Sequence, residues 1–527
     1  MPSWERQVSR RALLARSGSL LAAAALPAAA GAGMPQPGRG GTLRFATRGD
    51  ASGLDPHRHV FYLVSTPLAA LLQGLLDLNL QGEPVPGVAE EWEASADLRT
   101  YTFRLRKGVL FHNGREVDAA AVKWNLDRLR DPRVAHPFMR AALGDLGGVE
   151  VVDRYTLRCH LHQASAAFPA NVVYYPCSLI APDSAEQAHL HPVSCGPFRF
   201  VRWRRNEVSE LVRFEHYFET DAAGRPLPYL AELVGKPKKE DRVRLTALRA
   251  GEVELIDTVA YADAAAFPRR YAGRFQTWEV PTLGTAFLLF NLDRGPFADK
   301  RLRRAAAHAI DREAIKQAVF YGQGEIARGF YAPASPWHSP DVRPWPAYDP
   351  EQARALLRQA GAVGTTVLLQ SPLAYPYLRQ IGDLVQAMWS EVGFRVQHVV
   401  DEAPVLAQRR RQRAFHAEAS SASYRFDPDG WFARSLLSTS PSNQERANFR
   451  DERVDRLILE ARRTANRRRR LALYAEIDSL VNEELPLLYL HHLTLLQAGT
   501  VRLQGYQPGI SGAFSTQGAG VRTAWLA

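Results

Sequence analysis

The nearest approach to a metal-binding pattern in this sequence is a pair of histidines at alternating positions of a predicted strand. The stretch CHLH at residues 159–162 puts His160 and His162 on one face of that strand. Imidazole is a common ligand of transition metals, and His189 and His191 follow nearby in the chain. The interpretation that we favour is an exposed strand face that carries two histidines. We therefore expect no metal site and no bound cofactor.

The motifs of common catalytic and nucleotide-binding sites are absent from the sequence. It contains no glycine-rich phosphate loop, no H-E-x-x-H, no C-x-x-C and no G-x-S-x-G. No pair of acidic residues stands out as the two carboxylates of a hydrolase. A secreted hydrolase is the remote alternative.

The net charge of +11 raises the question of a nucleic-acid partner, and 59 of the 66 basic residues are arginine. The densest run, 467–470, lies between two predicted helices among aliphatic and acidic neighbours. Nucleic-acid binding requires basic residues interleaved with aromatic ones across one face. The run therefore indicates a solvated helix start, and we expect no nucleic-acid partner.

Residues 1–33 are typical of an export signal. Four arginines precede the alanine-rich apolar stretch 20–30, which is too short to span a membrane. The pair Arg10-Arg11 favours the twin-arginine route, with general secretion as the alternative. No cysteine precedes Cys159, so we expect a soluble periplasmic protein that is not a lipoprotein, with a net charge of +8 after cleavage.

Export would permit a disulfide, but three cysteines leave at least one thiol unpaired. Cys159 lies in the predicted strand 156–161, so Cys177 and Cys195 form the pair that we favour. The sequence leaves the connectivity open.

A chain of 527 residues is longer than one ordinary domain and mixes strand and helix patterns throughout. Apolar periodicity predicts an amphipathic helix over 300–320, and Asp349-Pro350 opens a helix that ends at Gly361. Strand 365–370, helix 376–392 and strand 394–400 form an α/β unit with a crossover helix. These patterns predict an α/β protein with more than one lobe.

Six segments in order resemble one family, the extracellular solute-binding proteins of ABC transporters that include dipeptide-, oligopeptide- and nickel-binding members. The most specific segment contains FRLRKGVLFHNG within VAEEWEASADLRTYTFRLRKGVLFHNGREVDAAAVKWNLDRL. The next two are GPFRFVRW and LTALRAGEVELID, and a fourth is FNLDRGPFADKRLRRAAAHAIDREAI. Together the segments occupy 88–129, 196–203, 245–257, 290–315, 348–361 and 454–490.

The resemblance implies a two-lobed periplasmic-binding-protein fold of class II type. Lobe one would comprise 42–283 plus 488–527, with an additional small subdomain at about 63–195, and lobe two would be 284–487. Such proteins are not enzymes. They capture a peptide or another small molecule between the lobes and deliver it to an inner-membrane ABC permease. We expect a monomer.

The resemblance also points to candidate ligand residues. In peptide-binding relatives an acidic residue four positions before the proline of a [DE]-P motif binds the ligand's ammonium group. Here the motif is Asp427-Pro428, and Tyr424 occupies that position. Arg425 can instead attract an anionic group, and Trp431 is a candidate wall of the pocket. Two alternatives stay open: Arg425 points to solvent, and Asp427 caps the local turn.

The other lobe would contribute the segment after Leu54-Asp55-Pro56, with His59, Phe61 and Tyr62 as candidates. A chelated-metal ligand of the nickel type is the alternative within the family, and His59 is its main support. A peptide-like or other small organic solute is the ligand that we favour.

The tyrosine at position 424 generates a first prediction. A tyrosine offers no salt bridge to a free amino terminus, so dipeptides should leave the melting temperature of the protein unchanged in a thermal-shift assay. Stabilisation by micromolar dipeptides, lost when their amino termini are acetylated, would contradict this interpretation.

Overall fold

Two sets of parallel strands belong to one large mixed sheet in the computed structural model, which describes residues 37–59, 67–422, 425–509 and 520–527. These residues fall within one compact unit, Pro37–Ala527. The strands of this sheet are β1 (Thr42–Thr47), β8 (Phe198–Arg204), β9 (Val208–Arg213), β10 (Glu232–Pro237), β11 (Leu255–Val259), β12 (Phe275–Phe290), β13 (Glu325–Ile326), β14 (Thr366–Pro372), β15 (Arg395–Asp401), β16 (Ala417–Ala422) and β17 (Leu487–Thr500). Their order is β15-β14-β16-β12-β17-β11-β1-β10-β9-β8, and β13 pairs with β17.

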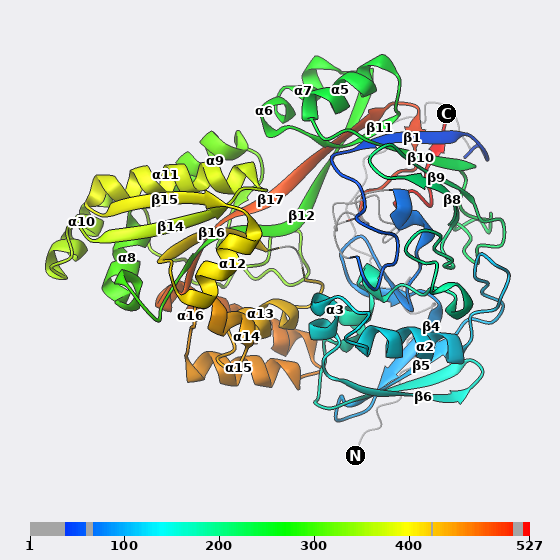
Figure 1. Cartoon of the computed structure of the whole chain (residues 1–527), viewed down its shortest axis with the longest axis horizontal. Helices are drawn as coiled ribbons and strands as arrows, with labels where there is room; N and C mark the ends of the chain where they lie inside the picture. Colours follow the sequence, from blue (N-terminus) through cyan, green and yellow to red (C-terminus); the bar gives the residue numbers. More distant parts are fainter. Residues whose placement is uncertain (1–36, 60–66, 423–424, 510–519) are drawn as a thin grey trace, which may run out of the picture. The chain divides into compact units, whose positions relative to one another are not determined.

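A ribbon of two long antiparallel strands, β12 and β17, joins the two ends of this sheet (Figure 1). On one side β14 pairs in parallel with β15 and β16, and on the other β1 pairs in parallel with β10 and β11. The register of the ribbon shifts between Pro281 and Thr285 and again between Ala286 and Phe287. Such bulges bend and twist a strand pair.

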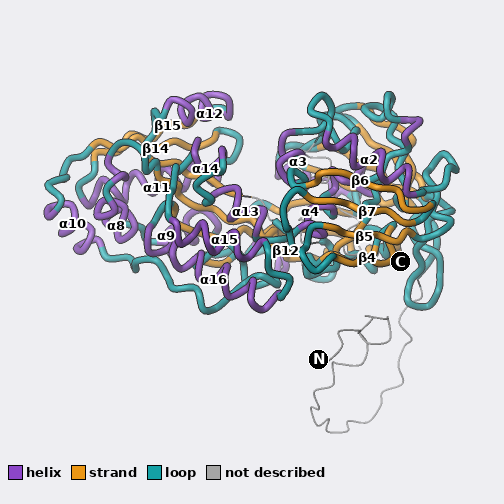
Figure 2. The backbone as a smooth tube through the Cα atoms, turned by 90° about the horizontal axis from the view of Figure 1, so that it is seen from below, coloured by secondary structure: helices purple, strands orange, loops and turns teal. Residues whose placement is uncertain are grey.

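A second, antiparallel sheet has the order β4-β5-β7-β6. Its strands are β4 (Ala89–Ala94), β5 (Thr100–Leu105), β6 (Leu146–Asp153) and β7 (Thr156–Leu161). Figure 2 shows them side by side, with helix α2 (Ala119–Arg130) next to β6. The Asp118 side chain caps α2 by accepting a hydrogen bond of 2.9 Å from the Ala121 N–H. The remaining short strands are β2 (Leu76–Leu78), β3 (Pro84–Pro86), β18 (Leu503–Gln504) and β19 (Trp525–Leu526).

Helices of varied length connect the strands of both sheets. In the first half of the chain these are η2 (Pro67–Leu71), α3 (Pro137–Ala142), α4 (Phe168–Val172), η3 (Tyr175–Cys177), η4 (Pro182–Ser184), α5 (Asp241–Ala250), α6 (Tyr261–Ala264) and α7 (Phe267–Arg270). In the second half they are η5 (Pro296–Ala298), α8 (Lys300–His308), α9 (Arg312–Phe320), α10 (Pro350–Gln359), α11 (Pro376–Val392), α12 (Ala403–Gln412), α13 (Asp429–Ser435), α14 (Pro441–Glu445), α15 (Glu452–Arg462) and α16 (Arg467–Glu484).

The prediction of one helix over 300–320 is wrong, because the structure divides it into α8 and α9. Asp311 takes an extended backbone conformation, and its carboxylate accepts a hydrogen bond of 2.9 Å from the Ala314 N–H. Aspartate competes well for backbone donors at a helix start, so the cap outweighs the continuous apolar periodicity. The prediction that Asp349-Pro350 opens a helix is confirmed, since Asp349 caps α10.

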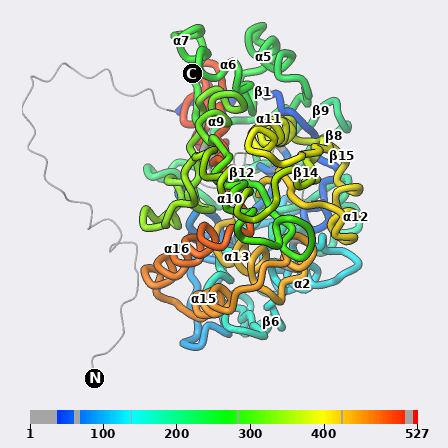
Figure 3. The backbone as a smooth tube through the Cα atoms, turned by 90° about the vertical axis from the view of Figure 1, so that its left-hand side faces the viewer, coloured from blue at the N-terminus to red at the C-terminus, as the bar shows by residue number. Residues whose placement is uncertain are grey.

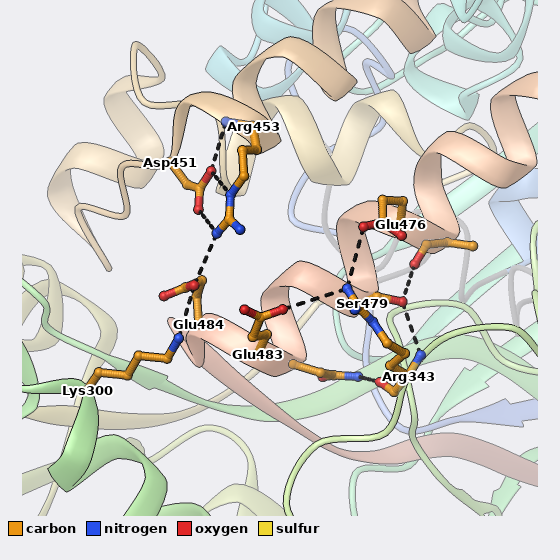
Figure 4. A network of polar contacts seen from close by, with 10 residues as sticks. Lys300, Arg343, Asp451, Arg453, Glu476, Ser479, Glu483 and Glu484 are labelled. Atoms are coloured by element: carbon orange, nitrogen blue, oxygen red, sulfur yellow. Dashed lines mark hydrogen bonds and ion pairs between the residues drawn. The ribbon is translucent and has the colours of Figure 1, made fainter.

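Helices α15 and α16 lie side by side (Figure 3). Surface ion pairs fasten α16 to its neighbours (Figure 4). Glu484 lies 3.0 Å from the Lys300 amino group and 3.1 Å from the Arg453 guanidinium. Arg343 makes looser pairs with two further glutamates of α16. These pairs connect α8, α15 and the loop before α10 to one helix.

All three cysteines are free and buried, which corrects the favoured pairing of Cys177 with Cys195. Burial raises the pKa of each thiol, so the reactive thiolate form is disfavoured. The cysteines belong to a hydrophobic cluster that runs from the four-stranded sheet to residues of α13, α16 and β17. In this structure they are small apolar core residues.

A small cavity beside α16 has room for about one water molecule. Its wall includes the buried carboxylate of Asp478, which accepts a hydrogen bond of 3.1 Å from the Phe330 N–H. Burial raises the pKa of Asp478 to about 7, against the opposing effect of hydrogen bonds from Tyr489 and Phe330. A Cβ at Gly329 would collide with this carboxylate, so glycine is required there.

The raised pKa of Asp478 predicts a pH-dependent stability. Between about pH 4 and 7 the folded protein holds a proton on this carboxyl that the unfolded chain has released, so its contribution falls as pH rises. As the pH rises from 5 to 8, Asp478→Asn should therefore gain stability relative to the wild type, by up to about 3 kcal/mol. Urea unfolding at the two pH values measures the difference.

The exposed Asp341 provides a matched control, because Asp341→Asn removes the same charge from the surface. Its stability difference from the wild type should not change with pH in this range. An equal difference at pH 5 and pH 8 for Asp478→Asn would contradict the assignment.

Candidate functional site

The segment that follows β16 contains three of the residues predicted to contact ligand: Arg425, Asp427 and Trp431. Of the others, Phe61, Tyr62 and Tyr424 lie outside the described residues. The segment stands at the carboxyl end of β16, beside the equivalent end of its parallel neighbour β14. In open α/β sheets ligands bind at such strand ends.

Asp427 is buried and pairs with Arg470 of α16 at 2.5 Å. The same carboxylate accepts a hydrogen bond of 3.0 Å from the Asp429 N–H, so it also caps the local turn. Although burial opposes it, the Asp427 carboxylate raises the pKa of Arg470. The Arg470 guanidinium also lies 4.9 Å from the centre of the Trp337 ring.

A second buried acid, Asp429, lies 3.1 Å from the Arg462 guanidinium of α15. Burial raises the pKa of Asp429 to about 6, and Arg462 opposes that change. Arg462 also pairs with Asp145, the residue before β6, and its carbonyl accepts a hydrogen bond of 2.9 Å from the Ala166 N–H. One arginine thus connects α13 with the loops of the four-stranded sheet.

Further contacts join the same regions. The rings of Tyr174 and Phe426 lie 4.8 Å apart, and the Phe426 N–H donates a hydrogen bond of 3.4 Å to the Tyr174 hydroxyl. Arg467 pairs with Glu83 at 2.5 Å. These contacts connect segments that the sequence analysis assigned to different lobes.

Trp431 lies in the core with 3% of its surface exposed. Its ring stacks on Phe330 at 4.1 Å between centroids and 9° between planes. The indole N–H points to the Tyr489 hydroxyl at 3.4 Å. The Trp431 ring is therefore packed against side chains of the protein core, where it supports the segment after β16.

His59 is partly buried, and its Nδ1 lies 3.3 Å from the Ser52 hydroxyl. It is not part of the segment after β16. Burial lowers the pKa of His59, so the neutral imidazole is favoured. Among the described residues, no group of three or more histidine, cysteine, aspartate or glutamate side chains could hold a metal ion.

Buried polar side chains, which were not predicted from the sequence, fix the position of the segment that contains His59. Asp55 accepts hydrogen bonds of 3.0 and 2.6 Å from the Arg128 guanidinium of α2. Arg128 also donates to Nδ1 of His57 at 2.7 Å, and Nε2 of His57 then donates to the Ser178 carbonyl at 3.1 Å. Burial lowers the pKa of His57 to about 4, which favours this neutral tautomer. The arrangement holds the chain immediately before residue 60.

The run 467–470 was interpreted as a solvated helix start, and this is correct for its first three arginines only. Residues 467–469 are exposed at the start of α16, whereas Arg470 is 5% exposed and pairs with Asp427. A helix that begins at Arg467 turns its fourth residue toward the protein. The periodicity of buried and exposed positions along a helix was the signal that would have distinguished Arg470 from the three exposed arginines.

His160 of β7 and His162, which follows that strand, are both exposed. His160 lies 3.1 Å from Glu150 across the sheet, with about half of its side chain exposed.

None of the helices in the part of the chain that the structure describes has the length and apolar character needed to cross a membrane.

Comparison with known proteins identifies the relatives of this arrangement. Residues 83–444 match the sequence model of the bacterial extracellular solute-binding proteins, family 5. The dipeptide-binding protein of Escherichia coli K12 is 26% identical over 505 residues, which cover 88% of this chain and 92% of that one. Heme-binding protein A of Haemophilus influenzae is 28% identical over 458 residues, which cover 80% and 81%.

Among solved structures, NikA from Brucella suis in complex with Fe(III)-EDTA superposes with a TM-score of 0.79 at 24% identity, covering 90% of this chain and 98% of that one. This likeness confirms the two-lobed periplasmic-binding-protein fold expected from the sequence. The family match covers more than half of the chain. The protein therefore belongs to family 5 of the bacterial extracellular solute-binding proteins, the solute-binding components of ABC importers.

Proposed function

We propose that the protein is a monomeric periplasmic carrier, without a lipid anchor, that encloses a peptide-like or other small organic solute and does not turn it over. In this proposal lobe one comprises 42–283 with 488–527, and lobe two comprises 284–487. The solute would then be presented to an inner-membrane ABC permease. The family to which the chain belongs consists of binding proteins, which supports this assignment.

The position of Arg462 is the observation that carries the proposal. This arginine belongs to lobe two in the proposed division, and it pairs with Asp429 of the same lobe and with Asp145 of the other. Only about a sixth of its side chain is exposed. A bridging charge pair of this kind favours a closed arrangement of two lobes, because separation would break the pair between Arg462 and Asp145.

The candidate ligand residues fit opposite walls of the proposed cleft. Lobe two would contribute Tyr424 and Arg425, with Asp427 holding the segment in place. Lobe one would contribute His59, Phe61 and Tyr62. Tyr174, which already contacts Phe426, marks where the two walls approach.

A peptide-like organic solute is favoured over a chelated metal. One relative is named a dipeptide-binding protein. The nickel-type alternative relied on His59, which is not part of the segment after β16 and whose Nδ1 lies 3.3 Å from the Ser52 hydroxyl.

Mass spectrometry of the natively purified protein tests the proposed function. We expect one small organic molecule to co-purify in about one-to-one ratio, to be released on unfolding, and to raise the melting temperature when added back. Turnover of that molecule, or a failure of every co-purified or added solute to bind, would contradict the proposal.

The Arg462 bridge predicts a change in closure. Asp145→Asn weakens a charge-assisted hydrogen bond of about 1.5–3 kcal/mol and should shift the closed-to-open ratio about 10- to 100-fold toward open. Small-angle X-ray scattering without added solute should then give a larger radius of gyration. Asp341→Asn is the control with the same change in charge. Equal radii for both variants and the wild type would rule out a closing role for Asp145.

A further inference from the structure

Three guanidinium groups gather where β16 leads into α13 and α14. The side chain of Arg425 lies against Gly430, where a Cβ would come 3.2 Å from its Cδ. Gly430 and Arg434 are four residues apart on α13, so Arg425 and Arg434 share one face of that helix. Arg446, immediately after α14, completes the group.

Arg446 contacts side chains of β16 itself. Its guanidinium donates a hydrogen bond of 2.8 Å to the Ser420 hydroxyl and approaches Glu418 at 3.4 Å. Glu418 is buried and also accepts hydrogen bonds of 2.7 and 2.6 Å from Arg410. Two arginines thus share the Glu418 carboxylate, which leaves their combined charge only partly balanced by it.

Two further acids of the segment after β16 are engaged by arginines from α15 and α16. Asp427 pairs with Arg470, and Asp429 pairs with Arg462. Arg434 stays accessible on the surface of α13, yet enough protein surrounds its guanidinium to lower its pKa to about 10. Desolvation is the larger cause of that change, and the charges of Arg425 and Arg446 add to it.

The group lies where a solute would meet protein in the proposed cleft. Arg425 follows the carboxyl end of β16. Burial raises the pKa of Tyr174, a residue of the other proposed lobe, to about 12, and the charge of Arg425 opposes that rise. Guanidinium groups bind carboxylates and phosphates through paired hydrogen bonds. Such pairs are strong where water is partly excluded.

We propose that Arg425, Arg434 and Arg446 bind a carboxylate or phosphate group of the solute, so that the protein selects anionic organic solutes. This inference rests on the proposed function, because it names the class of solute for the same cleft. It requires no contribution from the residues that the structure leaves undescribed.

Matched acid and amide probes test the inference. Citrate, glutarate, N-acetylglutamate and inorganic phosphate would be added to the mature protein at constant ionic strength, with glutaramide as the uncharged counterpart of glutarate. Titration calorimetry and thermal shift give the dissociation constant and the change in melting temperature. We expect at least one anion, and not glutaramide, to bind the wild type.

Variants then locate the site. The double variant Arg425→Gln/Arg434→Gln should raise the dissociation constant of that anion about 10- to 100-fold. Arg411→Gln removes the same kind of charge from the exposed face of α12 and should bind as the wild type does. Arg425→Lys/Arg434→Lys keeps the charge without the paired donors and should lie between them, which separates loss of binding from loss of folding.

Three outcomes would overturn the inference: equal binding of glutarate and glutaramide, unchanged affinity in the double glutamine variant, or no binding of any anion. The identity of the co-purified molecule distinguishes this failure from failure of the proposed function. A neutral or cationic solute, bound equally by the wild type and the double variant, would refute anion selection and leave solute capture intact.

Discussion

Burial of the Asp427 carboxylate is the constraint on which the arrangement around β16 depends. A carboxylate with 4% exposure requires a partner, and α16 supplies it through Arg470. Loss of one member of such a pair costs about 3–5 kcal/mol, because the other charge stays buried. The turn after β16 and the fourth residue of α16 therefore hold one another in place. Arg425 and α13 take their positions from that turn.

The same logic extends outward along the chain. Asp429 lies two residues further on and engages Arg462 of α15, which in turn reaches Asp145 before β6. A short stretch of two acids thus connects the large sheet, the two helices α15 and α16, and the four-stranded sheet. The apolar cluster shared by these regions buries hydrophobic side chains, and the ion pairs of the two acids fix how the regions fit against one another.

Much of this fold was predictable from local pattern. Strand 156–161, the capped helix at Asp349 and the crossover unit with α11 appear where the periodicity placed them. The helix break at Asp311 and the three free thiols were not predicted. A capping side chain overrides periodicity only when its own backbone becomes extended, and thiol pairing depends on distances that no local pattern contains.

The candidate site was less accessible to sequence reasoning. The motif around Asp427-Pro428 indicated the correct segment, but its partner Arg470 is 43 positions away in a run that appeared uniformly exposed. Trp431 was considered as a pocket wall, and its ring packs on Phe330 instead. Which aromatic residues face a cleft depends on how distant elements meet, and composition does not encode that.

The bulged ribbon of β12 and β17 has a mechanical consequence. Between Pro281 and Thr285 the ladder is interrupted, while paired hydrogen bonds continue on both sides. Such an interruption bends and twists the strand pair locally and leaves the ladder on either side intact. In the proposed division of the lobes, the boundary between residues 283 and 284 falls inside this interruption, so β12 would pass from one lobe to the other where its pairing with β17 is weakest.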